Sequence, residues 1–384
     1  MNLNDLSLQG KRVLMRVDFN VPMRGNTITD DSRIRASLPS IEYVLAHGAS
    51  LVLMSHLGRP KGPDPTCSLK PCAQRPSELL RKPVAFAPDC MSGETAAKAL
   101  QPGQVLLLEN LRFHPGEENP DADPQFAQKL SRLGNVYVND AFGTAHRDHA
   151  SVTRVVKYFP DKAAMGFLME REVLALKPLL EGPKRPFYAV MGGAKLSTKL
   201  GVIKNLLPRL DGLFLGGGMT YPFLKARGVS IGSSLCDGTV DKTLLNEKKI
   251  HLPVDLVITD QTSDKIVSIN DDIPDGWQGV DVGPKTIEQW CRQMQNAGTV
   301  FWNGPVGVFE NPKFAVGTKA LAEHLATLCR SGTDVIIGGG DSVAAVDALG
   351  LQKQFTHLST GGGASLEYLE FGKLPGLTAL SVAY

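Results

Sequence analysis

The sequence predicts an α/β protein with two doubly wound, mostly parallel-sheet domains that face each other across a cleft and are joined by a helix. Short apolar runs alternate along the chain with longer stretches of helical periodicity, as in buried parallel strands connected by helices. These runs form two sets of about six. A chain of 384 residues also exceeds the roughly 250–300 residues that one hydrophobic core usually serves, so two Rossmann-like domains are expected.

The expected strands are the runs rich in Val, Leu, Ile and aromatic residues. The first set comprises residues 12–17, 50–54, 83–87, 105–109, 136–139 and 163–167. The second set comprises residues 187–191, 212–215, 255–259, 299–303, 334–337 and 356–359. We therefore expect one sheet in each half of the chain.

A helix is predicted between the two sets. Residues 170–181 (EREVLALKPLLE) carry acidic side chains in the first turn and apolar ones at helical spacing, and a Gly-Pro pair follows. Pro178 should kink or end the last turn, which favours bending there. We place an N-terminal domain at residues 1–168, the interdomain helix at 169–182 and a C-terminal domain at 183–367.

The charge and cysteine content exclude several other classes of protein. Forty-one Lys and Arg against 39 Asp and Glu leave a net charge of +2, too small for a nucleic-acid binder. Six cysteines at irregular spacings, without a C-x-x-C pair, are typical of reduced thiols. The sequence shows neither a secretory leader nor an apolar stretch of about 18 residues, so we expect a cytoplasmic protein without a membrane partner.

Polar residues that can bind ligands or take part in catalysis follow directly after the apolar runs. Ligands of open α/β sheets bind outside the carboxyl ends of the strands, so this placement predicts a ligand site in each half. The first half supplies a set of cationic and imidazole side chains, namely Arg33, Arg59, Arg112, Arg147, His56 and His146. Clustered guanidinium groups suit a small phosphate or carboxylate, although each arginine taken alone is more often a solvated surface charge.

Glycine-rich loops distinguish the second half and let backbone N–H groups approach phosphates. Neither a G-x-x-x-x-G-K-[ST] loop nor a G-x-G-x-x-G fingerprint is present. Lys195 and Lys199 lie four residues apart, hence on one face of a predicted helix, where they could reach a phosphoryl group or simply be solvated. Asp341, after three glycines, fits either a helix N-cap or a Mg²⁺ ligand.

Long motifs, in order along essentially the whole chain, resemble those of phosphoglycerate kinases. They are KRVLMRVDFNVP (residues 11–22), SHLGRP (55–60), LLLENLRFHPGEE (106–118), VNDAFGTAHR (138–147), MGGAKLSTK (191–199), LGGGM (215–219), DVGPKT (281–286), WNGPVGVFE (302–310) and GGGDS (338–342). The resemblance implies a glycolytic phosphotransferase with a carboxyl group as acceptor. It would transfer a phosphoryl group reversibly and in line between 1,3-bisphosphoglycerate and ADP, with Mg²⁺, after hinge closure.

The resemblance also implies roles for individual residues. The glycerate ligand would be held in the N-terminal domain by Asp18, Phe19, Asn20, Arg33, His56, Leu57, Gly58, Arg59, Arg112 and Arg147. The nucleotide would be held in the C-terminal domain by Lys199, Gly217, Gly279, Asn303, Glu310, Gly339, Gly340, Asp341 and Ser342. Arg33 and Lys199 would be catalytic, Asp341 would bind the metal, and a tail, residues 368–384, would pack back on the first domain.

Three positions depart from the expected motifs: Asp148, Ser342 and Phe371. Ser342 keeps a hydroxyl group, whereas Asp148 adds a carboxylate beside a substrate arginine and is expected to lower acceptor affinity. A catalytically silent binding or scaffold member of the same fold is the alternative, and a dinucleotide-dependent oxidoreductase is a second one that lacks its fingerprint. We expect a monomer, because no exposed apolar stripe stands out.

Overall fold

The computed structural model describes residues 1–382, which divide into two compact units. The first unit combines Met1–Leu174 with the tail from Lys373, and the second is Ala175–Gly372. The boundary therefore falls inside helix α6 (Phe167–Glu181) and again just before α14 (Pro375–Val382). Within the first unit, α14 packs on the segment 145–154, where the N–H group of Gly376 donates to the carbonyl of Ala145 at 2.8 Å.

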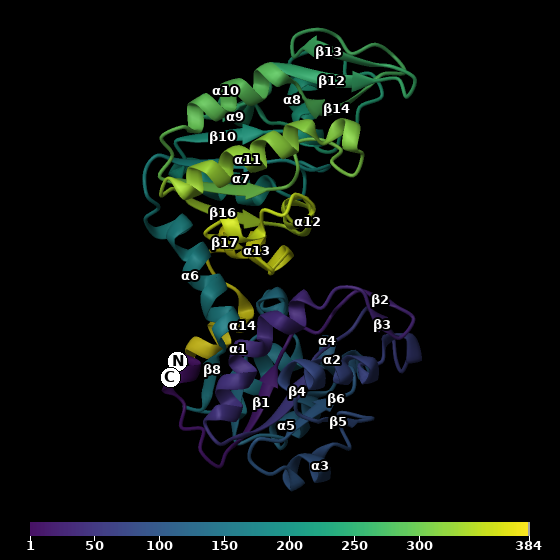
Figure 1. The fold of residues 1–384 in the computed structure, drawn as a ribbon, viewed down its shortest axis with the longest axis vertical. Helices are drawn as coiled ribbons and strands as arrows, with labels where there is room; N and C mark the ends of the chain where they lie inside the picture. The colour runs from purple at the N-terminus through teal and green to yellow at the C-terminus, as the bar shows by residue number, and fades with distance from the viewer. Residues whose placement is uncertain (383–384) are drawn as a thin grey trace. The chain divides into compact units, whose positions relative to one another are not determined.

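The first unit is built on a six-stranded sheet in the order β5-β6-β4-β1-β7-β8, in which every neighbouring pair is parallel. Its strands are β1 (Arg12–Arg16), β4 (Ser50–Met54), β5 (Val84–Ala87), β6 (Val105–Leu108), β7 (Val136–Asn139) and β8 (Ala163–Met165). Each corresponds to one predicted run, which confirms a parallel α/β sheet in this half. The strands lie together in the lower part of Figure 1.

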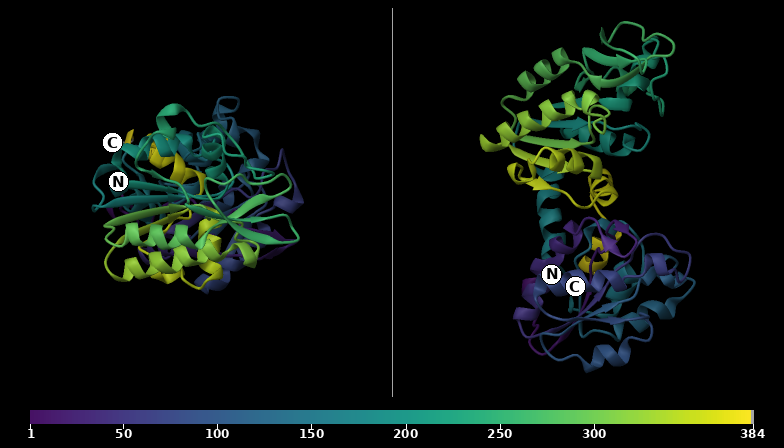
Figure 2. Two further views of the ribbon diagram at one scale, coloured as in Figure 1. Left: turned by 90° about the horizontal axis from the view of Figure 1, so that it is seen from above. Right: turned by 45° about the vertical axis from the view of Figure 1, so that its right-hand side comes forward.

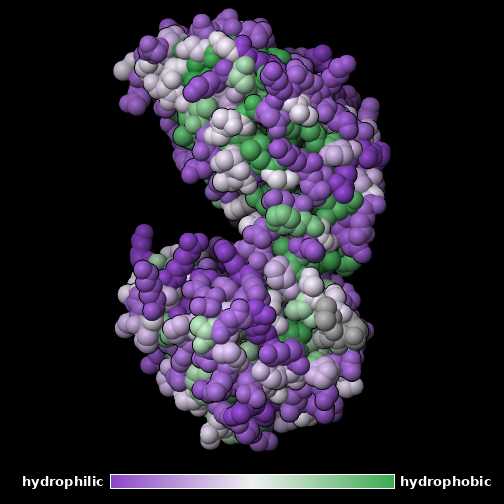
Figure 3. Space-filling model, turned by 180° about the vertical axis from the view of Figure 1, so that it is seen from behind, coloured by the Kyte–Doolittle hydropathy of each residue, from purple (hydrophilic) through white to green (hydrophobic). Residues whose placement is uncertain are grey.

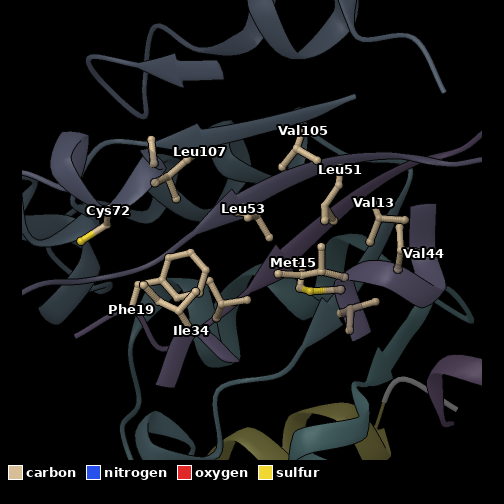
Figure 4. Packing of buried hydrophobic residues seen from close by; sticks show 14 of the residues in the cluster. Val13, Met15, Phe19, Ile34, Val44, Leu51, Leu53, Cys72, Val105 and Leu107 are labelled. Atoms are coloured by element: carbon tan, nitrogen blue, oxygen red, sulfur yellow. The ribbon is translucent and has the colours of Figure 1, made fainter. Parts of the chain in front are cut away.

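The core of this unit lies between the sheet and two helices, α1 (Ser32–Ala46) and α2 (Lys70–Leu80). Alternate strand residues point to the same face, so Val13 and Met15 of β1 lie beside Leu51 and Leu53 of β4 (Figure 4). From α1, Val44 lies beside Val13, and Ile34 lies beside Phe19 (Figure 4). On the face of this unit that the lower part of Figure 3 shows, hydrophilic residues predominate.

The second unit contains another six-stranded parallel sheet, in the order β11-β10-β9-β15-β16-β17. Its strands are β9 (Phe187–Met191), β10 (Gly212–Leu215), β11 (Ile250–His251), β15 (Thr299–Asn303), β16 (Asp334–Gly338) and β17 (His357–Leu358). Helices α10 (Pro284–Met294) and α11 (Val316–Arg330) cover one face of this sheet (Figures 1 and 2). Their Trp290 and Leu325 side chains belong to the same buried cluster as residues of the strands.

One predicted strand is not in this sheet. Residues 255–259 form β12 (Asp255–Thr259), which pairs antiparallel with β13 (Asp264–Ser268) and β14 (Gln278–Val282) in a separate three-stranded sheet. A tight turn causes this pairing, because the carboxylate of Asp260 accepts the N–H groups of Thr262 and Ser263 at 2.8 and 2.7 Å. The short strand β11 takes the edge of the main sheet instead.

Helix α6 is longer than the sequence predicts. It begins at Phe167 and continues through Glu181, so Pro178 does not end it. The ring of Pro178 removes only the hydrogen bond to the carbonyl of Leu174, a residue whose side chain is exposed, so water can satisfy that carbonyl. Within residues 1–382, no helix has the length and apolar character needed to cross a membrane.

Candidate active site

The loops at the carboxyl ends of the first sheet meet around β1. The chain runs from β1 to β4 on one side and later returns to β7 on the other, so the strand order reverses here, where open α/β sheets bind ligands. Two hydrogen bonds join the predicted residues: the N–H of Gly58 donates to Asn20 Oδ1 at 2.9 Å, and Arg112 donates to the carbonyl of Gly58 at 2.7 Å. Arg33 forms an ion pair with Asp18 at 2.6 Å. The structure thus brings these predicted residues together.

The predicted arginines differ in exposure. Arg59 and Arg147 are exposed, and Arg33 is about one third exposed, with 38% of its side chain accessible. Arg112 has only 10% of its side chain accessible, and its Nε lies 3.0 Å from Glu118. Phe19 and Leu57, also predicted at the site, are buried, and the Phe19 ring belongs to the hydrophobic core (Figure 4). Only their backbone groups are therefore available to a ligand.

Three histidines at this site have lowered pKa values, first because they are buried and second because arginines lie near them. Burial, followed by the charges of Arg16 and Arg112, holds the pKa of His56 well below its usual range. Burial and the same arginines lower the pKa of His149 to about 3, and burial together with Arg147 lowers that of His146 to about 4. These imidazoles are neutral at pH 7, so the arginines are the cationic groups of the site. Such a site favours a small polyanion.

A buried network beneath this site was not predicted. Arg16, fully buried in β1, donates from Nε to Ser151 Oγ at 2.9 Å and lies with another guanidinium nitrogen 3.2 Å from Nδ1 of His56. Ser151 in turn donates its N–H and hydroxyl groups to the buried carboxylate of Glu117 at 3.0 and 2.6 Å. Ser151 belongs to a π-helical turn, Ala150–Arg154. The signal in the sequence was an arginine directly after the apolar residues 13–15 of a predicted strand, since a buried charge requires partners.

The second unit holds a cavity of about 180 Å³ at the carboxyl ends of its strands. Four predicted residues line it, namely Gly217, Gly279, Glu310 and Asp341. Gly217 has a φ of +61°, and a Cβ atom there would lie 2.9 Å from the carbonyl oxygen of Gly193. Only glycine therefore lets these two loops approach so closely.

The remaining predicted nucleotide residues gather at the start of α12 (Gly340–Ala348). Gly339 is the N-cap residue, with a φ of +92°, so the alternative that Asp341 caps the helix is wrong. Nδ2 of Asn303 is buried without a hydrogen-bond partner among the described residues and faces Gly339. Ser342 is buried and accepts the N–H of Gly304 at 2.5 Å, so its hydroxyl group holds a loop.

The structure separates the two lysines. Residues 195–199 form a loop, and helix α7 (Leu200–Leu206) begins after Lys199, so the predicted common helical face is absent. Lys199 Nζ donates to the carbonyls of Gly192 at 2.7 Å and Asn303 at 3.1 Å, and burial lowers the pKa of Lys199 to about 8. Lys195 is exposed. Lys199 is therefore the lysine that the fold orients toward the glycine-rich loops.

Arginines gathered at the end of one parallel sheet, and a glycine-rich cavity beside a half-buried lysine on another, are features of a nucleotide-dependent phosphotransferase. Comparison with known proteins identifies which one. The chain belongs to the phosphoglycerate kinase family, whose profile, described as "Phosphoglycerate kinase", matches residues 3–373. Its reaction is the reversible transfer of a phosphoryl group between 1,3-bisphosphoglycerate and ADP, with 3-phosphoglycerate and ATP as products.

Individual relatives agree along the whole length. The phosphoglycerate kinase of Chloroherpeton thalassium is 50% identical, with 99% of each chain covered. The solved structure of the Coxiella burnetii phosphoglycerate kinase matches with a TM-score of 0.86 at 38% identity, covering 100% of this chain and 98% of that one. The structure from Pyrococcus horikoshii matches with a TM-score of 0.87 at 31% identity, covering 100% and 99%.

Proposed function

We propose that the first unit binds 3-phosphoglycerate and the second binds the nucleotide. The observation that carries this assignment is geometric: Arg33, which pairs with Asp18, and Arg112, which donates to the carbonyl of Gly58, belong to the loops at the carboxyl ends of the first sheet. The second unit offers backbone N–H groups at a helix start, which suit the phosphates of a nucleotide. The alternative of a silent scaffold protein has no observation in its favour.

In the acceptor site, Arg33, Arg59, Arg112 and Arg147 supply the cationic groups. Guanidinium groups bind carboxylate and phosphate in a bidentate manner, and such bonds are stronger than those between neutral groups. We assign Asp18 the task of orienting Arg33 through their ion pair, and Asn20 that of holding the Gly58 loop. Of these arginines, Arg33 is the one we assign to the transferring phosphoryl group.

In the nucleotide site, Gly217 and Gly279 line the cavity by backbone alone, and Glu310 is placed to accept a ribose hydroxyl group. Gly339 and Gly340 present N–H groups, and the unpartnered amide of Asn303 is available to a phosphate oxygen. The carboxylate of Asp341 does not cap helix α12. Its oxygen atoms suit Mg²⁺, a hard cation that prefers oxygen ligands. When bound, Mg²⁺ would neutralise charge on the nucleotide phosphates.

We assign Lys199 the task of stabilising the negative charge that develops on the phosphoryl group during transfer. It is held by two backbone carbonyls before substrate arrives, and preorganised donors of this kind lower a barrier without reorganisation. Direct transfer requires the two ligands to meet, so we propose that the units close in each turnover. Small-angle scattering with and without both ligands should then show compaction. An unchanged profile with full activity would contradict closure.

A coupled assay with 3-phosphoglycerate, ATP and Mg²⁺ tests the function as a whole. We expect ADP formation that depends on all three, with Arg33→Ala and Lys199→Ala strongly impaired. Calorimetric binding of both ligands without any turnover would instead favour the silent scaffold.

We also propose a monomer in the cytoplasm. The six cysteines are all free, as expected in a reducing compartment. The large exposed hydrophobic side chains among the described residues come from separate segments of the chain, such as Leu174, Leu235 and Phe371. Light scattering coupled to gel filtration should give the mass of one chain.

A further inference from the structure

Three side chains of metal-ligand type meet in the first unit, outside the residues assigned to either substrate. Asp89 and Cys90 follow β5, and His114 immediately precedes α4 (Pro115–Glu118). One ligand atom from each of the three lies within 4.8 Å of the others. The Nε2 atom of His114 is 2.7 Å from Oδ1 of Asp89. The fold therefore gathers a sulfur, a nitrogen and an oxygen from two separate segments.

The cluster has a buried end and an open end. Cys90 is buried, whereas the side chains of His114 and Asp89 are 32% and 41% exposed. The carboxylate of Asp89 is held by the N–H groups of Met91 and Ser92, each at 3.2 Å. The His114 ring packs against Phe126, with ring centroids 5.5 Å apart. An ion could therefore enter from solvent and find ligands that are already positioned.

The charge of the three ligands themselves favours a dication. A thiolate, the Asp89 carboxylate and a neutral imidazole together carry two negative charges, which a dication balances. A dication bound here would thus leave no uncompensated charge beside the buried sulfur.

We propose that Asp89, Cys90 and His114 bind a divalent transition-metal ion of the zinc type, with solvent as the fourth ligand. A thiolate and an imidazole exclude Mg²⁺ and Ca²⁺ as preferred occupants. Tetrahedral zinc places its ligand atoms about 3–4 Å apart, so small side-chain rotations suffice. Binding exchanges the thiol proton for the metal and releases that proton to water. The proton that Nε2 of His114 donates to Asp89 passes through solvent to Nδ1, and the His114–Asp89 hydrogen bond gives way to two metal–ligand bonds.

This site would be distinct from the metal of the reaction, but it is linked by sequence to the acceptor site. His114 lies two residues after Arg112, in the segment that continues to Glu117. A bound ion would tie this segment to the end of β5. It should therefore stabilise the first unit against unfolding.

Cobalt(II) is the probe of choice, because a thiolate ligand gives it a near-ultraviolet charge-transfer band. The metal-free full-length protein, kept reduced without a chelating thiol, is titrated with Co²⁺ and then with Zn²⁺. We expect a saturable band that zinc abolishes, and a rise in melting temperature with zinc. Cys90→Ser should lose the band, and His114→Gln should weaken binding. Cys72→Ser, which removes another buried thiol of the same unit, should retain the cobalt band.

The outcomes are decisive in both directions. Loss of the band in Cys90→Ser but not in Cys72→Ser assigns the sulfur ligand. If the Cys90 variant fails to fold, the half-exposed His114→Gln and Asp89→Asn variants carry the test, judged by loss of the zinc-dependent thermal shift. Absence of the band in the unaltered protein, or its survival in every variant of the cluster, overturns the proposal.

Discussion

Asp140 holds the start of helix α6, because its buried Oδ1 atom accepts the N–H group of Leu168 at 2.9 Å. A second, longer bond of 3.3 Å comes from the N–H of Met169. Gly166 makes the approach possible, since a Cβ atom there would lie 2.3 Å from the same oxygen. Asp140 also opens the loop that carries Arg147, so one carboxylate joins the acceptor loop to the helix that contains the boundary between the units.

This arrangement predicts a pH dependence of stability. Burial raises the pKa of Asp140 from 3.8 to about 7, so between these values the folded state binds a proton that the unfolded state has lost. The contribution of Asp140 to stability is therefore complete below about 3.8 and is lost as the pH rises to about 7. An asparagine side chain cannot ionise. In Asp140→Asn, the melting temperature relative to the unaltered protein should rise between pH 4 and pH 7, whereas parallel profiles would contradict the prediction.

Lys199 and Lys195 provide a matched pair for testing the phosphoryl site. Lys199→Ala should lower kcat by roughly 10²–10³-fold, the typical loss for a preorganised donor, and leave the 3-phosphoglycerate KM nearly unchanged. Lys195→Ala should have little effect, because Lys195 is exposed. Steady-state kinetics on both variants decide the matter. Equal losses would mean that Lys199 has no special role.

The lowered pKa of Lys199 adds a test that needs no mutation. Its charge is present below pH 8 and is lost as the pH rises through about 8, so kcat/KM for the nucleotide, which reports the free enzyme, should fall above that pH. Lys195→Ala should show the same profile as the unaltered protein. A flat profile from pH 7 to pH 9 would show that the amine remains protonated or unimportant.

The sequence was sufficient to locate these strands because a buried strand requires a continuous apolar run, and each of the twelve predicted runs contains a strand. The sequence did not reveal which strands pair with one another. Residues 255–259 have the composition of a central strand, yet the turn at Asp260 pairs them with β13. The edge strand β11 has only two residues and left no signal. The pairing of β11 with β10 joins segments distant in sequence, which composition does not encode.

Part of the candidate site was predictable from the sequence and part was not. Glycines at the ends of strands and arginines in loops can be recognised in the sequence, because their roles depend on the residue type itself. The Arg16–Ser151–Glu117 network was missed because its members lie far apart in the chain and meet only in the fold. Lys195 and Lys199 could not be distinguished, since the spacing suggested a helix where the structure has a loop.

Asp148 illustrates a prediction that the structure changes. The sequence suggested a carboxylate that weakens the acceptor arginine beside it. Instead, Asp148 accepts the hydroxyl group of Thr153 at 2.5 Å and a guanidinium N–H of Arg154 at 2.9 Å. Its charge is thus largely paired, and Asp148→Ala should leave the 3-phosphoglycerate KM within about twofold, as for other exposed ion pairs of small net effect. A fall in KM of tenfold would restore the original interpretation.

The acceptor site should respond to salt more than the nucleotide site does. Several arginines attract a small polyanion there, and two of them, Arg59 and Arg147, are exposed, so their attraction is screened as the Debye length falls from about 8 Å at physiological ionic strength to about 3 Å at 1 M. Arg112 is largely enclosed and should be screened less. We therefore expect the 3-phosphoglycerate KM to rise with added chloride more steeply than the nucleotide KM at constant free Mg²⁺.

Arg59→Ala should raise the 3-phosphoglycerate KM at low salt and flatten its salt dependence, because one screened charge has been removed. Lys195→Ala, which removes an exposed charge from the other unit, serves as the control and should leave that dependence unaltered. An acceptor KM that is independent of salt, or a slope that Arg59→Ala does not change, would show that the exposed arginines do not contribute to the acceptor site.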